Sequence, residues 1–384
     1  MLRFLSAGES HGRALVAIIE GLPAGIKVDA ERVNDFLRRR QGGYGRGKRM
    51  DIEQDRVDFL SGLRGGLTLG SPLTLAIYNR DWENWQEVMA ATAEANLAER
   101  VITRPRPGHA DLAGGLKYRQ DDLRNILERA SARETAIRVA VGAIAAEFLR
   151  AMAIEVQGQV IAIGHIHAFV EEKIFNRSLF ETPLYCPDEK ATAFMMKAID
   201  EAQEKGNTLG GIIRIIGAGI PPGLGSHVQW DRRLDGRLAQ AMMSIPAIKG
   251  VEIGAGFATA ALAGSAVHDE ITYEAGQKRF CHGSNHAGGL EGGITNGEQL
   301  VIQAAMKPIP TLTQALGSVD MVTKEPSPAS VERSDVCAVP AAAVVGEAVT
   351  AWVLAEAVLE KFGGDHMEET LLNYRNYCEY LEGR

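Results

Sequence analysis

The sequence predicts an α+β fold in one pseudo-symmetric domain. Short apolar runs interrupted by glycine alternate with amphipathic stretches, which indicates strands mixed with helices. Residues 132–152 and 341–362 are rich in alanine and predict two helices that pack closely at the centre. Each of these stretches follows a Glu-Arg pair, first at Glu128-Arg129 and again at Glu332-Arg333, and such a repeat indicates a duplicated unit.

In the first half of the chain, Asp29 is expected to cap a helix that continues to about Arg40. Residues 87–99 predict a further helix, and Asp121 or Asp122 is expected to cap the helix that precedes residue 132. The predicted strands are apolar runs bounded by turn residues, and they lie before residue 8 and over 15–20, 57–61 and 74–78.

In the second half, residues 171–187 are polar and predict a loop, and Gly206 is expected to end the helix before it in a left-handed conformation. Proline keeps 307–311 extended, and the tail at 363–384 predicts a peripheral helix with a frayed end. The predicted strands lie over 160–164, 212–216, 251–257 and 300–304, and the predicted helices over 190–205 and 234–245. The echo of residues 109–115 in 286–293 supports the duplication and one domain over 1–384.

The composition limits the class of protein. The net charge of −8 over 384 residues counts against a dedicated nucleic-acid binder, which is usually basic. The four cysteines are widely spread without a C-x-x-C pair, so we expect a reduced, cytoplasmic chain without a metal site. The N-terminus does not have the pattern of a signal peptide. Glu347 and Glu356 interrupt the apolar stretch at 336–359, which indicates a buried helix and not a membrane span.

Cationic side chains are concentrated in three segments, at residues 38–49, 104–111 and 128–135. The first is rich in glycine and lacks acidic residues, which is typical of a lid over an anionic ligand or of a short RNA-binding tract. Guanidinium groups bind phosphate and carboxylate bidentately, and a helix N-terminus offers free N–H groups to the same ligands. The segments therefore predict a site for a small polyanion. The alternative is that these arginines pair with Glu128, Glu134 and neighbouring aspartates.

The candidate acid–base groups on loops are His11, His109 and Asp335, with His282 and His286 as alternatives. The sequence contains no nucleophile elbow, Walker P-loop, H-E-x-x-H motif or Rossmann fingerprint, which counts against covalent hydrolase, NTPase and zinc chemistry. The residues alone thus predict an enzyme that acts on a small anionic molecule with proton transfer.

Seven motifs in unbroken order resemble those of the chorismate synthase family, and they extend from the first residues to about Phe362. They are Ala7-Gly8-Glu9-Ser10-His11-Gly12, Arg38-Arg39-Arg40-Gln41-Gly42-Gly43-Tyr44-Gly45-Arg46-Gly47, Arg104-Pro105-Arg106-Pro107-Gly108-His109-Ala110-Asp111, Arg129-Ala130-Ser131-Ala132-Arg133-Glu134-Thr135, Gly289-Leu290-Glu291-Gly292-Gly293, Lys307-Pro308-Ile309-Pro310-Thr311 and Glu332-Arg333-Ser334-Asp335.

The resemblance implies a lyase of the shikimate pathway to aromatic amino acids. Its reaction would be the anti-1,4-elimination of phosphate from 5-enolpyruvylshikimate 3-phosphate to give chorismate, with reduced FMN required but without net redox change. NADPH is the reductant that the resemblance suggests. The implied fold is a β-α-β sandwich with central helices between antiparallel sheets, assembled as a homotetramer.

The resemblance also implies roles for individual residues. His109 would protonate the reduced flavin or stabilise its anion, His11 would protonate the departing phosphate, and Asp335 would assist removal of the C6 proton. Ser10 and Ser131 would support these groups. The implied substrate clamp consists of Arg46, Arg49, Arg106, Arg133 and Arg333, and the positions associated with NADP are Arg40 and Arg46. The implied FMN contacts are Arg129, Ala130, Ser131, Pro246, Ala247, Gly292, Lys307, Pro308, Ile309, Pro310, Thr311 and Arg333.

Two departures from the family pattern affect the implied flavin site. Ala130 stands where the family often has serine, and Pro246 stands where some members have asparagine, so two side-chain contacts would be lost. Two other functions remain open on the sequence alone. One is a flavin-dependent oxidoreductase, which would consume a reductant stoichiometrically, and the other is an RNA-binding protein that uses residues 38–49.

Overall fold

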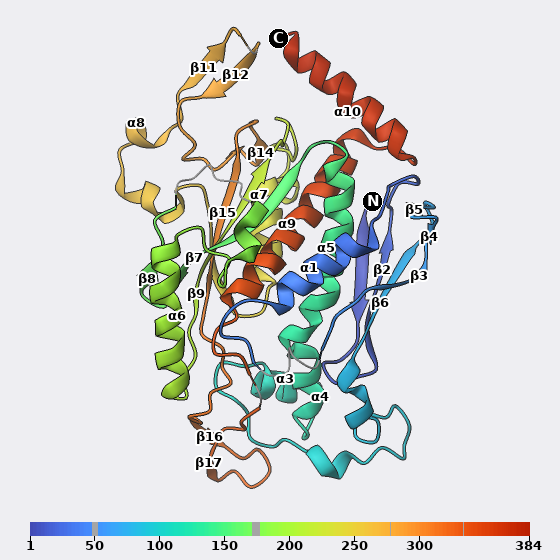
Figure 1. Ribbon diagram of the computed structural model, residues 1–384, viewed down its shortest axis with the longest axis vertical. Helices are drawn as coiled ribbons and strands as arrows, with labels where there is room; N and C mark the ends of the chain where they lie inside the picture. Colours follow the sequence, from blue (N-terminus) through green and yellow to red (C-terminus); the bar gives the residue numbers. More distant parts are fainter. Residues whose placement is uncertain (48–52, 171–176, 277, 333) are drawn as a thin grey trace.

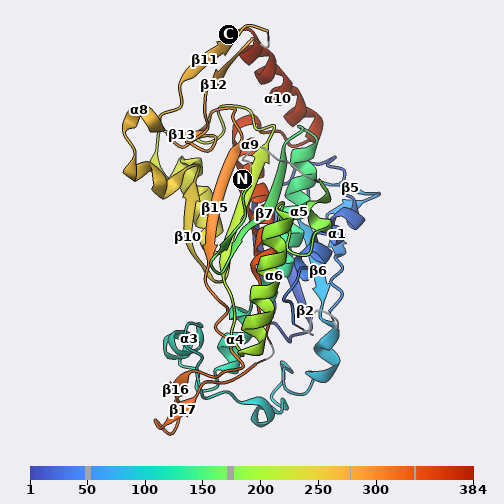
Figure 2. The ribbon, with the colours of Figure 1, turned by 60° about the vertical axis from the view of Figure 1, so that its left-hand side comes forward.

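Two antiparallel sheets enclose a layer of helices in the computed structural model (Figure 1). The structure describes residues 1–47, 53–170, 177–276, 278–332 and 334–384. The first sheet has the order β1-β2-β6-β3 and the second the order β10-β15-β9-β7-β8. The helices α5 and α9 lie between them, which confirms the expected sandwich (Figures 1 and 2). The first-sheet strands are β1 (Arg3–Ala7), β2 (Ala14–Glu20), β3 (Asp58–Ser61) and β6 (Leu73–Tyr78); those of the second are β7 (Glu155–Ile163), β8 (Ile166–His167), β9 (Gly211–Ala218), β10 (Ile248–Ile253) and β15 (Leu300–Met306).

The two halves of the chain share one topology, so the expected duplication is confirmed. If β7, β9, β10 and β15 are matched to β1, β2, β3 and β6, the two sheets have the same strand order. A helix follows the second strand of each half, and a long central helix ends each half. These helices are α1 (Ala30–Gln41) and α5 (Thr135–Arg150) in the first half, and α7 (Leu234–Met243) and α9 (Val339–Phe362) in the second.

A pair of threonines repeats the same hydrogen bonds in both halves. The Thr68 hydroxyl donates to the Pro23 carbonyl at 2.7 Å and accepts from the Ile26 amide at 2.9 Å. The Thr295 hydroxyl donates to the carbonyl of Pro221 at 2.7 Å and accepts from the amide of Leu224 at 2.8 Å. Both threonines lie in small hairpins, β4–β5 (Leu63–Arg64 and Leu67–Thr68) and β13–β14 (Leu290–Glu291 and Ile294–Thr295).

One part of the expected repeat, the match of residues 286–293 with 109–115, is wrong, as these hairpins show. Both turns are glycine pairs with positive φ, at Gly65-Gly66 (59° and 77°) and at Gly292-Gly293 (59° and 81°). The counterpart of Gly292 is therefore Gly65, and residues 286–293 do not correspond to 109–115. The reason is the chain order, because the segment with His109 follows the strand β6, whereas the segment with His286 precedes β15, the counterpart of β6.

The central helices pack closely because small residues lie at the contacts. A Cβ atom added to Gly142 of α5 would lie 2.3 Å from the Ala348 carbonyl oxygen of α9, and one added to Gly158 of β7 would lie 2.1 Å from that of Ala343. Within the described residues, α9 is the one helix long and apolar enough to cross a membrane, but 89% of its most apolar window is buried inside the protein. It is thus a core helix, as expected.

Most other predicted elements are present with small shifts. Asp29 caps α1 through the Glu31 amide, and Gly206 adopts φ of 65° after α6 (Glu189–Glu204). The helix predicted over 87–99 is wrong, because Val88 is the one buried residue of this segment, which forms only short turns. The strand predicted over 251–257 is displaced because it ends before Gly254, whose φ is 60°. Residues 171–176 of the predicted loop lie outside the described residues.

Most of the remaining elements form the two ends of the molecule, whereas α6 lies along one side, beside β8 (Figure 1). The sequence missed α3 because its glycines disfavour a helix, but Gly114 and Gly115 allow close packing on Ile126 and Leu123. The tail forms a capped peripheral helix, as predicted. These elements are α3 (Asp111–Tyr118), α4 (Arg124–Ala130), α6 (Glu189–Glu204), α8 (Gly264–Val267), β11 (Ile271–Glu274), β12 (Arg279–His282), β16 (Gly317–Val319), β17 (Pro326–Pro328) and α10 (Met367–Glu382), with 3-10 turns at Arg80–Asn84, Leu97–Arg100, Ala132–Glu134, Arg177–Glu181, Trp230–Arg232 and Gly256–Ala261.

Candidate active site

The N-terminal ends of α5 and α9 lie at the same end of the molecule, beside α3 and α4 (Figure 1). The last turn of α1 and the loop after it connect these two ends. Arg40 donates from Nε to the Thr135 hydroxyl and from Nη2 to the Ala132 carbonyl, both at 2.8 Å. The Gly45 carbonyl accepts from the amides of Val336 and Cys337. The N-termini of both central helices therefore converge on one region.

His11 is held at this end by Glu128 of α4. The Nδ1 atom of His11 lies 2.9 Å from Oε1 of Glu128, and the His11 amide donates to Oε2 at 2.7 Å. The Ser10 amide donates to the backbone carbonyl of Glu128 at 2.9 Å. Burial alone would raise the pKa of Glu128, but its hydrogen bonds with His11 and the charge of Arg124 lower it. The indole of Trp85 stacks on the imidazole at a centroid distance of 3.9 Å.

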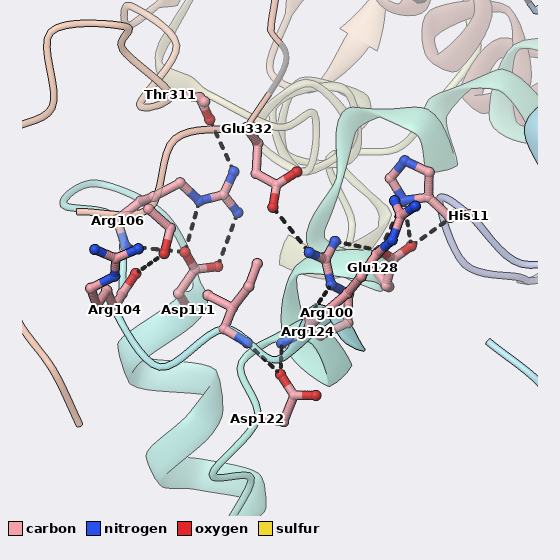
Figure 3. A network of polar contacts seen from close by, with 12 residues as sticks. His11, Arg100, Arg104, Arg106, Asp111, Asp122, Arg124, Glu128, Thr311 and Glu332 are labelled. Atoms are coloured by element: carbon pink, nitrogen blue, oxygen red, sulfur yellow. Dashed lines mark hydrogen bonds and ion pairs between the residues drawn. The ribbon is translucent and has the colours of Figure 1, made fainter. Parts of the chain in front are cut away.

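Arg124 continues this network toward the start of α9 (Figure 3). Its guanidinium lies 3.3 Å from Glu128 and 3.1 Å from Glu332, a residue of the segment that leads into α9. Asp122 accepts from the Arg124 amide at 2.9 Å and from the Ile102 amide at 3.0 Å, but it lies one residue before Leu123, which is the N-cap of α4 in place of the expected aspartate. His11 is thereby connected through α4 to the segment that carries Asp335.

His109 is held by Asp111 in a similar way. The Nδ1 atom of His109 lies 2.6 Å from Oδ1 of Asp111, and Arg106 donates from Nε to Oδ2 at 2.8 Å. Arg106 also donates to the Thr311 hydroxyl at 2.9 Å, which ties this loop to residues 307–311 (Figure 3). Asp111 is fully buried. Burial would raise its pKa, but the hydrogen bonds from His109 and Arg106 hold the pKa well below the usual range.

Asp335 and Arg46 form an ion pair beside the start of α9. Their closest atoms are 2.8 Å apart, and the Gly47 amide donates to the Asp335 carboxylate at 2.7 Å. A cavity of about 570 Å³ is lined by Arg46 of this pair together with Glu53 and Asp55. Residues 42–47 are tied by backbone hydrogen bonds to the start of α9 and to Pro183, so this part of the expected lid is anchored. Lys48 and Arg49 lie outside the described residues.

Two of the expected substrate clamps are buried in ion pairs, and one of them, Arg106 with the neighbouring Asp111, forms the kind of pair that the alternative interpretation predicted. Arg133 is 4% exposed, and its guanidinium lies 2.6 Å from Asp55 and 2.7 Å from the Asn79 side chain. Arg106 is 8% exposed and donates to Asp111 and Thr311. These guanidiniums shape the site but are largely used within the protein. Arg333, the remaining clamp and an expected flavin contact, lies outside the described residues.

The arginines of the glycine-rich segment that the structure describes also have partners inside the protein. Arg40 is 4% exposed and donates from Nε and Nη2 within the protein, which leaves little of its guanidinium for the expected contact with NADP. Arg39 binds Glu347 at 3.0 Å, with its guanidinium near the rings of Phe36 and Phe180. Arg38 pairs with Asp35. The RNA-binding alternative thus loses most of the cations that suggested it.

Part of the expected flavin segment lies against the loop of His109. The Lys307 side chain donates to the Gly108 carbonyl at 2.7 Å, and its amide donates to the Ala247 carbonyl at 2.9 Å. Burial and the nearby charge of Lys249 lower the pKa of Lys307. Ala247 has φ of 69°, an uncommon conformation for alanine that is often found at functional sites. The other expected residues are neighbours in sequence, since Pro246 precedes Ala247 and residues 308–310 (Pro308, Ile309 and Pro310) follow Lys307. They lie at the same end of the sheet.

The other residues that were expected to contact FMN do not lie together in the structure. Arg129 donates to the carbonyls of Ser6 and Gly8, and Ser131 accepts from the amide of Arg133 at 3.2 Å. Arg129 and Arg133 do not share a face, because the extended backbone of Ser131 ends α4 between them, directly after Ala130. Gly292 precedes β15 and Lys307 follows it, so the strand keeps them at opposite ends of the sheet. His282 and His286 lie with Gly292, where His282 pairs with Glu291 and His286 with Asp269.

Three residues that complete the site were not predicted, namely Glu128 and Asp111 as histidine partners and Trp85. The spacing of His109 and Asp111 is a local signal that could have indicated the second pair. Nothing in the sequence connects His11 with Glu128 or Trp85, because these contacts join segments that are far apart in the chain.

Comparisons with known proteins agree on one family. A family model described as chorismate synthase matches residues 2–359. The chorismate synthase of Moorella thermoacetica is 63% identical over 386 residues, which cover 99% of this chain and 100% of that protein. That of Desulforamulus reducens is 62% identical over 385 residues, which cover 99% of each.

A solved structure described as a crystal structure of chorismate synthase superposes on this fold with a TM-score of 0.80 and 44% sequence identity. The superposition covers 100% of this chain and 99% of that chain. Sequence and fold agree over nearly the whole length, and the chain therefore belongs to the chorismate synthase family of shikimate-pathway lyases.

Proposed function

We propose that this enzyme eliminates phosphate from 5-enolpyruvylshikimate 3-phosphate to give chorismate, with reduced FMN required but not consumed. The C–O bond to phosphate and the C6–H bond break, the electron pair of the C–H bond ends in the new conjugated double bonds, and phosphate leaves with the pair of the C–O bond. The substrate is therefore neither oxidised nor reduced overall.

The observation that carries the proposal is the pair of histidines at one end of the molecule, each held at Nδ1 by a buried carboxylate. His11 binds Glu128, and His109 binds Asp111. Such a partner fixes the ring and directs Nε2 away from the carboxylate, where it can hold or transfer a proton. An elimination that releases phosphate and removes a proton requires groups of this kind.

We assign the proton transfers to the chain as follows. His11, carrying a second proton on Nε2 in addition to the one on Nδ1, donates that second proton to the departing phosphate. His109 holds a proton at Nε2 toward the flavin, and Asp335 assists removal of the C6 proton. Arg46, paired with Asp335 at 2.8 Å, brings positive charge to the same region. Ser10 and Ser131 hold the backbone beside these groups, and Arg49 and Arg333 complete the substrate clamp.

The residues around Lys307 fit a flavin phosphate. Lys307 and Lys249 place two positive charges near one another, and their repulsion and the burial of Lys307 lower its pKa. A bound anion would stabilise the charged form of Lys307 and so offset both its burial and the repulsion from Lys249. Lys307–Thr311, Ala247 and the turn at Arg129–Ser131 would hold FMN, with Gly292 supplied from elsewhere in the assembly. When bound, reduced FMN supplies transient electron density to the substrate.

The test is anaerobic phosphate release from 5-enolpyruvylshikimate 3-phosphate with chemically reduced FMN in catalytic amount. Many turnovers per flavin are expected. One phosphate per flavin, or consumption of reductant in proportion to product, would instead support the oxidoreductase alternative. No release by protein that binds FMN would refute the proposed substrate. His109→Ala should reduce turnover strongly while leaving the fold intact, and turnover like that of the wild type would remove His109 from the mechanism.

Three further expectations from the family belong to the proposal. The enzyme is a cytoplasmic homotetramer, and NADPH provides the electrons that reduce the flavin. Large apolar side chains that are exposed on the single chain, among them Trp230, Phe257 and Phe280, support burial by other subunits. Sedimentation measurements would test the assembly, and flavin reduction by NADPH under anaerobic conditions would test the reductant.

A further inference from the structure

We infer that Glu128 is the positioning residue of His11: it keeps the proton on Nδ1 and directs Nε2 toward the substrate phosphate. This inference rests on the proposed role of His11 in the elimination. Glu128 itself does not reach the reacting atoms, because both of its carboxylate oxygens contact His11. It acts through the imidazole that it holds.

The first argument is the number of bonds that one residue makes to the Ser10–His11 turn. The side chain of Glu128 accepts from the His11 amide at 2.7 Å and contacts Nδ1 at 2.9 Å, and its backbone carbonyl accepts from the Ser10 amide at 2.9 Å. A carboxylate can only accept hydrogen bonds, so its partner at 2.9 Å must carry a proton. Nδ1 thus keeps its proton, and Nε2, which is directed away from Glu128, is the nitrogen that gains and loses a proton.

The second argument is the enclosure of the ring. Trp85 covers one face of the imidazole, and its own indole is covered by the guanidinium of Arg100 at 4.0 Å. The indole N–H donates to Asp81 at 3.0 Å, which fixes the plane of Trp85. The imidazole of His11 therefore cannot rotate freely about its Cβ–Cγ bond. Among the residues that the structure describes, none forms a hydrogen bond with Nε2 of His11.

The third argument is the cost of the arrangement. Glu128 is 2% exposed, and burial of a carboxylate is unfavourable unless charged and hydrogen-bonding partners compensate. Arg124 provides one partner but is shared with Glu332, so the main partner of Glu128 is His11. Carboxylates that orient a functional histidine in this way act through its tautomer and basicity, and their removal typically reduces activity.

The test compares Glu128→Gln with Glu347→Gln. Glu347, a residue of α9, is a matched control because it is also a buried glutamate, 4% exposed. It binds Arg39 and accepts a hydrogen bond from the backbone amide of Gly158 in β7. Glutamine in place of Glu128 keeps the size but must place an NH₂ group against the His11 amide or Nδ1. We expect kcat to fall about 10- to 100-fold in Glu128→Gln with a much smaller change in KM, and little change in Glu347→Gln.

A second readout does not depend on activity. Nitrogen-15 NMR of histidine-labelled enzyme reports which ring nitrogen carries the proton, and the signal of His11 is identified by its loss in His11→Asn. The wild type should show a protonated Nδ1, and Glu128→Gln a mixture of tautomers. Glu128→Asp, which keeps the charge, should recover part of the lost kcat.

The outcomes separate the inference from the proposed function. A wild-type enzyme without phosphate release refutes the proposed function, whereas the NMR result still decides how Glu128 acts on His11. Wild-type protein in which Nδ1 carries no proton would overturn the inference even if no Glu128 variant folds. The inference also fails if Glu128→Gln keeps both the wild-type kcat and the Nδ1 proton.

Discussion

Replacing Asp111 by asparagine tests how strongly the loop of His109 depends on one carboxylate. Asp111 is fully buried and accepts from Nε of Arg106 at 2.8 Å, from the Arg106 amide at 3.1 Å, and from Nδ1 of His109 at 2.6 Å. Asp111→Asn removes the charge, places an NH₂ group among these donors and leaves the buried Arg106 guanidinium without its counter-charge. Arg106 would then lose its alignment with Thr311, and His109 its orientation.

Removing one partner of a buried ion pair costs about 3–5 kcal/mol, and we expect Asp111→Asn to fall in this range. The pH dependence follows from the lowered pKa of Asp111. A carboxyl whose pKa is depressed by folding stabilises the protein above its unfolded pKa of about 3.9, and that stabilisation is lost as the pH falls through the lower folded value. The difference between wild type and variant should therefore be constant from neutral pH to about pH 5 and narrow only below about pH 4.

Urea denaturation at several pH values measures both quantities. Asp35→Asn is the control, because Asp35 is half-exposed and its surface pairs with Arg38 and Arg39 should contribute less than about 1 kcal/mol. An Asp111→Asn variant as stable as Asp35→Asn, or a difference that narrows already between pH 7 and pH 5, would refute this reasoning. Activity should also fall, because His109 loses the partner at Nδ1.

Three further predictions concern other parts of the fold. Gly142→Ala should destabilise the protein by about 1–3 kcal/mol because a Cβ would lie 2.3 Å from the Ala348 carbonyl oxygen, whereas Gly236→Ala, with no atom within 4 Å, should be neutral or stabilising; equal effects would contradict the packing argument. Thr68→Val and Thr295→Val should each cost about 1–3 kcal/mol in denaturation experiments, and a large effect at only one of them would count against equivalent roles in the two halves. Burial raises the pKa of Cys337 to about 11, so native protein at pH 8 should leave this thiol unalkylated by iodoacetamide until urea is added, and rapid native alkylation would disprove its burial.

The duplicated halves show which features of the fold could be predicted from patterns in the sequence and which could not. The two alanine-rich helices and their preceding Glu-Arg pairs were visible because they recur with similar composition, and the structure gives both halves the same strand order. The glycine-rich segments were matched incorrectly, because glycine pairs occur in several turns and their composition alone does not tell which strand they precede. Only the pairing of strands identified Gly65 as the counterpart of Gly292.

The arginines show what sequence patterns could not predict, namely which partner each guanidinium binds. The sequence predicted a concentration of guanidinium groups, and the structure places Arg106 and Arg133 in buried ion pairs with Asp111 and Asp55. An arginine that binds a ligand and one that binds an internal carboxylate have the same side chain. Which of the two it does depends on whether an acidic residue lies within reach after folding, and Asp55 is far from Arg133 along the chain.

The sequence by itself determined the family, the order of most strands and helices, and the candidate histidines, because apolar periodicity, capping residues and ordered motifs are local properties of the chain. The tertiary structure decided what holds those histidines. Glu128 and Trp85 reach His11 from segments distant in sequence, and the network from His11 to Glu332 exists only because folding brings Arg124 of α4 within reach of Glu332, in the segment before α9. Orientation of a side chain depends on contacts across the fold, and such contacts leave no periodic signal in the residues that make them.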